Sequence, residues 1–318
     1  MFFVILLHCD FVALGYITNL EVLQNPLASV VKLLIESFGI VAVNVFVFIS
    51  GWFSIKASIK GIIKFLFHCA FFVWGIYILL YFLGLQPLNK DLLLETIFFT
   101  NGWFIFAYIL LYVISPILNI FSLKSKRHTF KMIIVALFTF QTIFDFMLDI
   151  FSIYNGGYST ISFINIYLLA RYINIYKPKF SRFNRKTDLC IYVFISLFIV
   201  LFSLIVPFFC VTIPSIRNND YLISGILRRM YWLDSPFVIV SAVFLFLYFY
   251  KLNIQSKVIN WVASSCFSVY LLHDTNSYIT NNLQKFLQQL YISLPIYGYW
   301  LRVLFYIIIY HLRCCYSN

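Results

Sequence analysis

Long apolar stretches alternate with short polar breaks along the whole chain. Ten of these stretches approach the roughly 20 residues that a helix needs to cross about 30 Å of hydrocarbon. Their hydrophobicity is continuous rather than alternating, which favours helices over the strands of a membrane barrel. The pattern predicts an all-α polytopic membrane protein with about ten transmembrane helices. The predicted spans are residues 1–17, 37–54, 62–85, 96–121, 131–151, 160–176, 188–209, 234–250, 258–280 and 291–312.

The basic residues between these spans predict the orientation. Lys and Arg gather in alternate loops, with fifteen in one set and seven in the other, and Arg171 lies near the inner end of the sixth span. Loops rich in Lys and Arg stay on the cytoplasmic side. Both termini are therefore predicted to be cytoplasmic, with the segment 210–233 outside.

Composition supports the membrane assignment and excludes other classes. Apolar side chains make up 63% of the chain and charged side chains 11%, whereas soluble domains carry about 25% charged residues. A soluble enzyme, a nucleic-acid binder and a disordered protein are excluded together. The net charge of +12 is typical of orienting loops in contact with membrane lipids. No linker or appended soluble domain is visible, so residues 1–318 are predicted to form a single membrane domain.

Ionisable groups at membrane depth are candidate functional residues, because burying them in lipid is costly. Two sites contain histidine. His8 lies midway along the first span, beside Cys9 and Asp10, and can act as a proton acceptor; the alternative is a hydrogen bond between helices. His273 precedes Asp274 in the ninth span, where the alternative is interfacial anchoring. Neighbouring residues point about 100° apart on a helix, so an orienting carboxylate for His273 is expected from another helix.

Two further groups are candidates. Asp145 and Asp149 are four residues apart and so on one face of the fifth span. Paired carboxylates suit acid–base chemistry or cation passage, although Asp149 lies near the outer boundary. The four-residue spacing of Lys56, Lys60 and Lys64 places their ammonium groups on one face at the cytoplasmic entry of the third span. Such a row of lysines can bind phosphates. Alternatively, it only sets the orientation of the protein in the membrane and attracts anionic lipid. The seven cysteines form no CxxC pair, and no metal site is predicted.

Several segments, taken in order, resemble acyltransferase family 3, the bacterial multi-pass membrane O-acyltransferases that modify glycans. His8 ends an apolar run as in that family's first helix. The other segments that carry the resemblance are Val43-Asn44-Val45-Phe46-Val47-Phe48-Ile49-Ser50-Gly51-Trp52; Asn101-Gly102-Trp103-Phe104 through Tyr108, Leu111-Tyr112 and Ser115-Pro116-Ile117-Leu118-Asn119; Gly156-Gly157-Tyr158-Ser159 with Phe163, Tyr167 and Ala170-Arg171-Tyr172-Ile173; and Phe267-Ser268-Val269-Tyr270-Leu271-Leu272-His273.

The resemblance implies transfer of an acyl group, most simply acetyl, from acyl-coenzyme A to a hydroxyl of an exported or lipid-linked polysaccharide in the bacterial cytoplasmic membrane. Acyl-coenzyme A would be a co-substrate, and no permanently bound cofactor is expected. His8 is then expected to be the catalytic base. The expected substrate-binding residues are Lys56, Lys60, Lys64 and Arg171 for the coenzyme phosphates and Ser50, Trp103, Tyr108 and His273 for the pocket. Ser50-Gly51 can instead be a close-packing pair, and Trp103 an interfacial anchor.

One departure from the family pattern concerns the N-terminus. In the family an Arg or Lys precedes the first-helix His by eleven residues, and that position would lie before Met1. The first helix is therefore expected to be truncated. Two other hypotheses remain: a non-enzymatic transporter for a glycan lipid or small solute, in which the buried His and Asp residues line a path, and an inactive acyltransferase-like protein.

Overall fold

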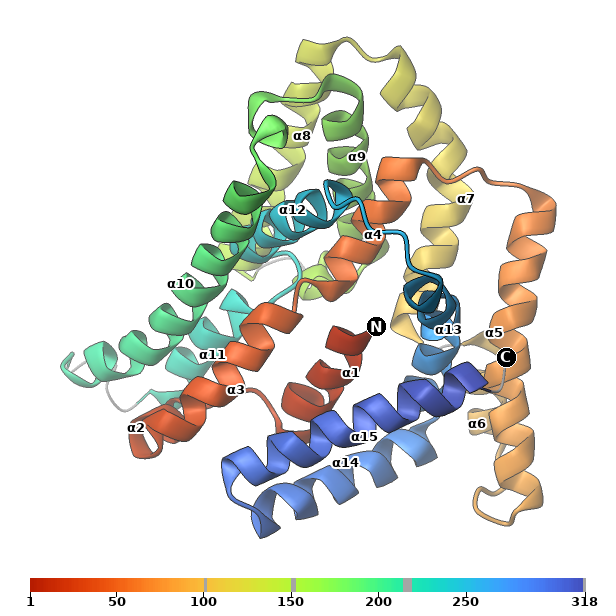
Figure 1. Cartoon of the computed structure of the whole chain (residues 1–318), viewed down its shortest axis with the longest axis vertical. Helices are drawn as coiled ribbons and strands as arrows, with labels where there is room; N and C mark the ends of the chain where they lie inside the picture. Colours follow the sequence, from red (N-terminus) through yellow and green to blue (C-terminus); the bar gives the residue numbers. More distant parts are fainter. Residues whose placement is uncertain (100–101, 150–152, 214–218, 317–318) are drawn as a thin grey trace. The chain divides into compact units, whose positions relative to one another are not determined.

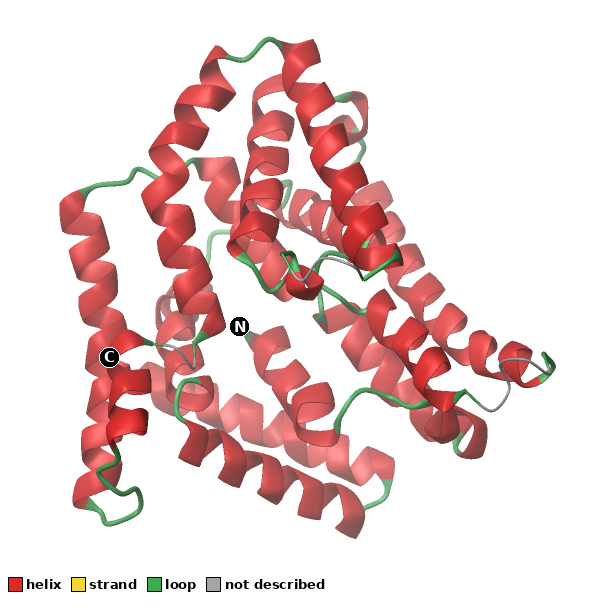
Figure 2. Cartoon of the chain, turned by 180° about the vertical axis from the view of Figure 1, so that it is seen from behind, coloured by secondary structure: helices red, strands yellow, loops and turns green. Residues whose placement is uncertain are grey.

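The computed structural model describes residues 1–99, 102–149, 153–213 and 219–316. Within these ranges the chain is helical throughout and contains no strand. Figures 1 and 2 show helices joined by short loops. The all-α prediction is therefore confirmed.

The helices are grouped into two compact units, each assembled from separate parts of the sequence. Unit 1 contains residues 1–14, 57–113 and 254–318, and unit 2 contains residues 15–56 and 114–253. The sequence analysis predicted that residues 1–318 form a single membrane domain. The two compact units do not test this, and it stays a prediction.

Unit 1 brings the two ends of the chain together. In it α13 packs on α5, α14 and α15, while α1 packs on α15, and α14 and α15 form the antiparallel pair seen in Figures 1 and 2. Its elements are α1 (Phe2–Leu7), η1 (His8–Val12), α5 (Ile59–Phe82), α6 (Lys90–Phe98), the first half of α7 (Trp103–Lys124), α13 (Lys257–Asp274), α14 (Ser277–Ser293) and α15 (Ile296–Tyr316).

Unit 2 is a bundle in which α10 packs on α3 and α12, while α4 packs on α9 and α12. Its elements are α2 (Asn19–Gln24), α3 (Pro26–Gly39), α4 (Ala42–Phe53), the second half of α7, α8 (Arg127–Gln141), η2 (Thr142–Met147), η3 (Asn155–Gly157), α9 (Thr160–Tyr176), η4 (Lys179–Arg182), α10 (Arg185–Val211), α11 (Asp220–Met230) and α12 (Pro236–Tyr250).

Every predicted span contains a helix, but the helices differ in length from the predicted spans. The first apolar run forms helical turns over Phe2–Val12 only, and α12 is also short. The predicted span 258–280 is divided, because α13 ends at Asp274 and a new helix begins at Ser277. Five stretches in the described part are long and apolar enough to cross a membrane: Pro26–Phe53, Ile59–Phe82, Lys90–Lys124, Arg127–Met147 and Arg185–Val211. Ten spans and the orientation of the termini stay predictions.

The contact between α4 and α9 depends on a glycine. A Cβ placed on Gly51 would lie 2.6 Å from the backbone oxygen of Tyr167 and 2.9 Å from the Cβ of Ala170. Small residues let membrane helices approach this closely. Gly51 therefore belongs to a close-packing pair of helices, which was the structural alternative for Ser50-Gly51.

We expect Gly51→Ala to lower the midpoint of thermal unfolding of the purified protein, because the new methyl group meets backbone atoms that cannot move aside. Overpacking of this kind costs roughly 1–3 kcal/mol. Gly75→Ala in α5 is the matched control, since a Cβ there meets nothing within 4 Å. Equal midpoints for the two variants would contradict this account of the α4–α9 contact.

Candidate functional site around His8

The first helix is interrupted where its histidine lies. After α1 the backbone widens into the π-helical turn η1, and within it Asp10 has non-helical angles of φ −102° and ψ −106°. Single π turns inside α-helices are frequent at functional sites. In the distorted turn some backbone carbonyls lose the hydrogen bonds of a regular α-helix. When such carbonyls are buried they need other hydrogen-bond donors.

Side chains of α14 and α15 supply those donors. The hydroxyl of Tyr299 donates to the carbonyl of Cys9 at 2.5 Å. The amides of Gln284 and Gln288 donate to the carbonyls of Val12 and Ala13 at 3.3 and 2.7 Å. The irregular turn is therefore fixed by residues from the far end of the chain.

The imidazole of His8 contacts a carboxylate. Its Nδ1 lies 3.3 Å from Oδ1 of Asp274, and the two side chains are 17% and 14% exposed. A carboxylate only accepts hydrogen bonds, so it favours the tautomer of His8 that carries the proton on Nδ1. Nε2 of the neutral ring then keeps its lone pair. This is the arrangement in which a buried carboxylate orients a histidine that acts as a base.

The ring of His273 packs against that of His8. The two rings meet edge to face with centroids 4.8 Å apart. Nδ1 of His273 lies 2.7 Å from the carbonyl of Val269, to which it must donate. The sequence predicted an orienting carboxylate from another helix for His273; the structure instead brings Asp274 from another helix to His8.

An apolar cavity of about 370 Å³ is lined in part by the two histidines. It is lined by Ile5, His8, Cys9, Leu272, His273, Ile279, Leu283, Phe286, Leu287, Val303, Tyr306 and Ile307. Its volume is within the range of small-molecule sites, roughly 300–1,000 Å³. Among the described residues no group of three or more His, Cys, Asp or Glu side chains is placed to hold a metal ion.

The predicted basic stripe needs a correction. Helix α5 begins at Ile59 after the cap Ser58, so Lys56 precedes the helix and does not share a helical face with Lys60 and Lys64. The last two are exposed on α5 and belong to unit 1, while Lys56 and Arg171 belong to unit 2. Arg171 is only 7% exposed, and its Nε has no hydrogen-bond partner within the described chain.

The three remaining predicted pocket residues are Ser50, Trp103 and Tyr108. Ser50 donates to the carbonyl of Phe46 at 3.2 Å within its own helix. Trp103 begins α7 and its ring contacts that of Phe104. Tyr108 contacts Phe104, whose ring contacts Tyr270. None of the three is among the residues that line the cavity.

Asp145 and Asp149 do not form the predicted one-faced pair. Asp145 accepts a hydrogen bond from the backbone N–H of Gly156 at 3.1 Å. Asp149 lies beyond the end of η2 with a positive φ of 53° and forms an ion pair with Arg229 at 3.3 Å. The four-residue spacing assumed a regular helix, but α8 ends at Gln141 and the π-helical η2 that follows it ends at Met147.

Several residues of the His8 site were missed by the sequence analysis. Asp274 was noticed only as the neighbour of His273, and Tyr299, Gln284 and Gln288 were not noticed at all. The spacing of Gln284 and Gln288 by one helical turn in a polar stretch was an available signal. No signal in the sequence identified their partner, because the π turn is not visible in the hydrophobic pattern.

Comparison with known proteins identifies the class. The model of the acyltransferase domain of acyltransferase family 3 matches residues 1–312. The chain therefore belongs to acyltransferase family 3, a family of membrane proteins that transfer acyl groups. No curated protein and no solved structure matches the chain.

We expect Tyr299→Phe to destabilise the protein, because it leaves the buried carbonyl of Cys9 without its donor. An unsatisfied buried acceptor costs about 1–3 kcal/mol. The midpoint of thermal unfolding measures the effect. Tyr297→Phe is the matched control on the same helix, since Tyr297 is 66% exposed; an equal loss in both variants would show that the Cys9 contact contributes nothing.

Proposed function

We propose that the chain transfers an acyl group from acyl-coenzyme A to a hydroxyl of an exported or lipid-linked polysaccharide, in the bacterial cytoplasmic membrane. The observation that supports this most directly is the His8–Asp274 contact at 3.3 Å beside an apolar cavity. Acyl transfer needs a base next to a space for the acyl group, and this arrangement supplies both.

In the proposed reaction Nε2 of His8 takes the proton of the acceptor hydroxyl while that oxygen attacks the thioester carbonyl carbon. The tetrahedral intermediate then collapses, the carbon–sulfur bond breaks, and the departing coenzyme A thiolate takes the proton from His8. Asp274 holds the ring through Nδ1 and stabilises the imidazolium that forms between the two steps. The products are the acyl ester and free coenzyme A.

The acyl group of the donor, acetyl in the simplest case, would occupy the cavity lined by His8, Cys9 and His273. Aliphatic side chains of α14 and α15 form most of its wall, and they favour a hydrocarbon chain over water.

Arg171, Lys56, Lys60 and Lys64 are each candidate contacts for a phosphate of the coenzyme in this proposal. The buried guanidinium of Arg171, whose Nε has no partner in the described part, supports this assignment. Arginine binds phosphate oxygens through paired N–H donors, whereas lysine contributes a point charge. Ser50, Trp103 and Tyr108 stay lower-ranked pocket residues in the proposal.

We expect His8→Ala to lower acyl transfer from radiolabelled acetyl-coenzyme A by about 10²–10⁴-fold, the usual contribution of a general base. Asp274→Asn should also lower it, because an amide can donate as well as accept and no longer fixes the tautomer. Asp274→Glu should restore part of the rate. Transfer to a polysaccharide acceptor, or hydrolysis of the thioester in its absence, is measured with the purified protein.

His128→Ala is the control, since His128 is exposed in unit 2 and lies outside the cavity. Full activity of His8→Ala with normal folding would contradict the base assignment. Absence of transfer and of hydrolysis in the natural chain would favour a transporter or an inactive family member.

A further inference from the structure

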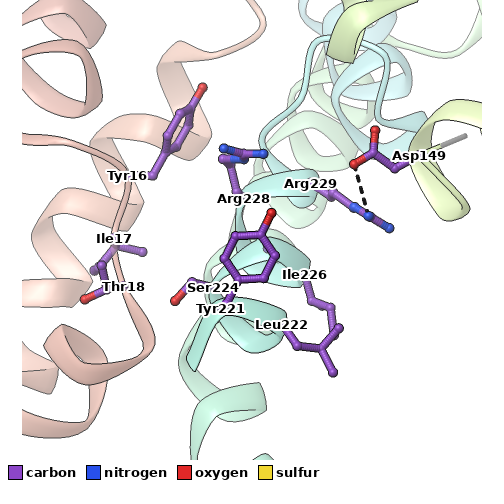
Figure 3. A pocket seen from close by; sticks show the side chains of 11 residues that line it. Tyr16, Ile17, Thr18, Asp149, Tyr221, Leu222, Ser224, Ile226, Arg228 and Arg229 are labelled. Atoms are coloured by element: carbon purple, nitrogen blue, oxygen red, sulfur yellow. Dashed lines mark hydrogen bonds and ion pairs between the residues drawn. The ribbon is translucent and has the colours of Figure 1, made fainter. Parts of the chain in front are cut away.

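Unit 2 contains a polar cleft whose lining residues have no role in the proposed reaction. We call it the tyrosine–arginine cleft, after Tyr16, Tyr158, Tyr221, Arg228 and Arg229. It consists of two adjoining cavities of about 280 and 310 Å³ that share Tyr16, Asp149 and Arg228. Figure 3 shows the first of them, with side chains from residues 16–18, from Asp149 and from α11.

One side of the cleft is fixed by two glycines. Gly156 and Gly157 have φ of 61° and 90°, which favours glycine. A Cβ on Gly156 would lie 3.1 Å from the ring of Trp232, and one on Gly157 would lie 2.5 Å from Cβ of Leu233. The N–H of Leu233 donates to the carbonyl of Gly156 at 2.9 Å. The Gly-Gly-Tyr-Ser segment therefore packs directly on the loop that follows α11 and positions Tyr158.

The two arginines differ in their partners. Arg229 is held by Asp149 at 3.3 Å and donates to the carbonyl of Met147 at 2.8 Å. Arg228 is exposed and lies over the ring of Trp232, 5.9 Å from its centroid. Within the described residues Arg228 forms no ion pair. Its guanidinium is thus a positioned cation available to a ligand.

Aromatic and hydroxyl groups surround this cation. Figure 3 draws Arg228 between the rings of Tyr16 and Tyr221. Tyr221 is 90% exposed, and Tyr16 is hydrogen-bonded to Tyr158. A flat ring, a cluster of phenol hydroxyls and a guanidinium together suit a sugar ring that carries an oxyanion, because the ring faces cover C–H groups and the guanidinium pairs with two oxygens.

The predicted topology is a second observation that favours a binding role for Arg228 and Arg229. Residues 210–233 were predicted to lie outside, where lysine and arginine are disfavoured by the positive-inside bias. Adjacent Arg228 and Arg229 oppose that bias. A role in binding explains their place better than orientation does.

We infer that the tyrosine–arginine cleft binds an acidic sugar unit, carrying a carboxylate or a phosphate, of the glycan acceptor. The inference rests on the proposed function for the identity of the acceptor, although binding itself needs neither His8 nor an acyl donor. An anionic lipid headgroup offers a similar oxyanion. The tyrosine hydroxyls and the exposed ring of Tyr221 favour a sugar.

The test is binding by isothermal titration calorimetry to the full chain in phosphatidylcholine nanodiscs. The probes are tetragalacturonate, a hyaluronan tetrasaccharide and glucose 1-phosphate, with maltotetraose as the neutral counterpart. We expect at least one acidic probe to bind at least tenfold more tightly than maltotetraose. Arg228→Ala should weaken that binding roughly tenfold or more, the effect of one charge-assisted contact.

Variants and controls separate the outcomes. Tyr221→Ala should also weaken binding, and its exposed side chain carries no folding role. Arg182→Ala, an exposed arginine elsewhere in unit 2, should leave binding unchanged, and so should His8→Ala. Normal binding in a chain that transfers no acyl group would keep this inference while removing the proposed reaction.

Three results would overturn the inference. They are equal binding of acidic and neutral probes, no loss in Arg228→Ala, and no binding of any acidic probe. A lipid headgroup site is the fourth outcome that contradicts it: phosphatidylglycerol nanodiscs would then abolish the binding of the acidic probes that is seen in phosphatidylcholine nanodiscs.

Discussion

The structure around His8 depends on satisfying backbone carbonyls that a distorted helix leaves without partners. In an apolar environment each unpaired carbonyl is costly. The non-helical angles at Asp10 are tolerated because Tyr299, Gln284 and Gln288 reach the carbonyls of the turn. The same contacts hold the first helix against α14 and α15, so the position of His8 is set by residues at the other end of the chain.

The hydrogen bonds to these backbone carbonyls also bring the candidate side chains of unit 1 together. Once α1 is held in unit 1, His8 meets Asp274 at the end of α13, and the cavity forms between these helices and the α14–α15 pair. Unit 2 uses a different device: Gly156 and Gly157 allow two loops to touch, and the contact positions Trp232 beneath Arg228. In both places an irregular backbone segment, not a continuous helix, sets where the candidate side chains lie.

The sequence predicted the helical class and the family, because continuous hydrophobicity and motif order are local signals. It failed where geometry departs from a regular helix. Lys56 lies before α5, Asp149 lies beyond η2, and the first helix spans only Phe2–Val12. Asp274 could not be paired with His8 from spacing, since the two are joined by tertiary packing alone. The arginines of α11 were counted only as loop charges.

The central claim is that Asp274 holds His8 with its proton on Nδ1 and its lone pair on Nε2. Solid-state nitrogen NMR of the ¹⁵N-histidine-labelled protein in lipid measures the tautomer directly, with His8 identified by the signals that His8→Gln removes. The account predicts a protonated Nδ1 and an unprotonated Nε2 in the natural chain, and a shift of the proton toward Nε2 in Asp274→Ala. A proton on Nε2 in the natural chain would contradict it.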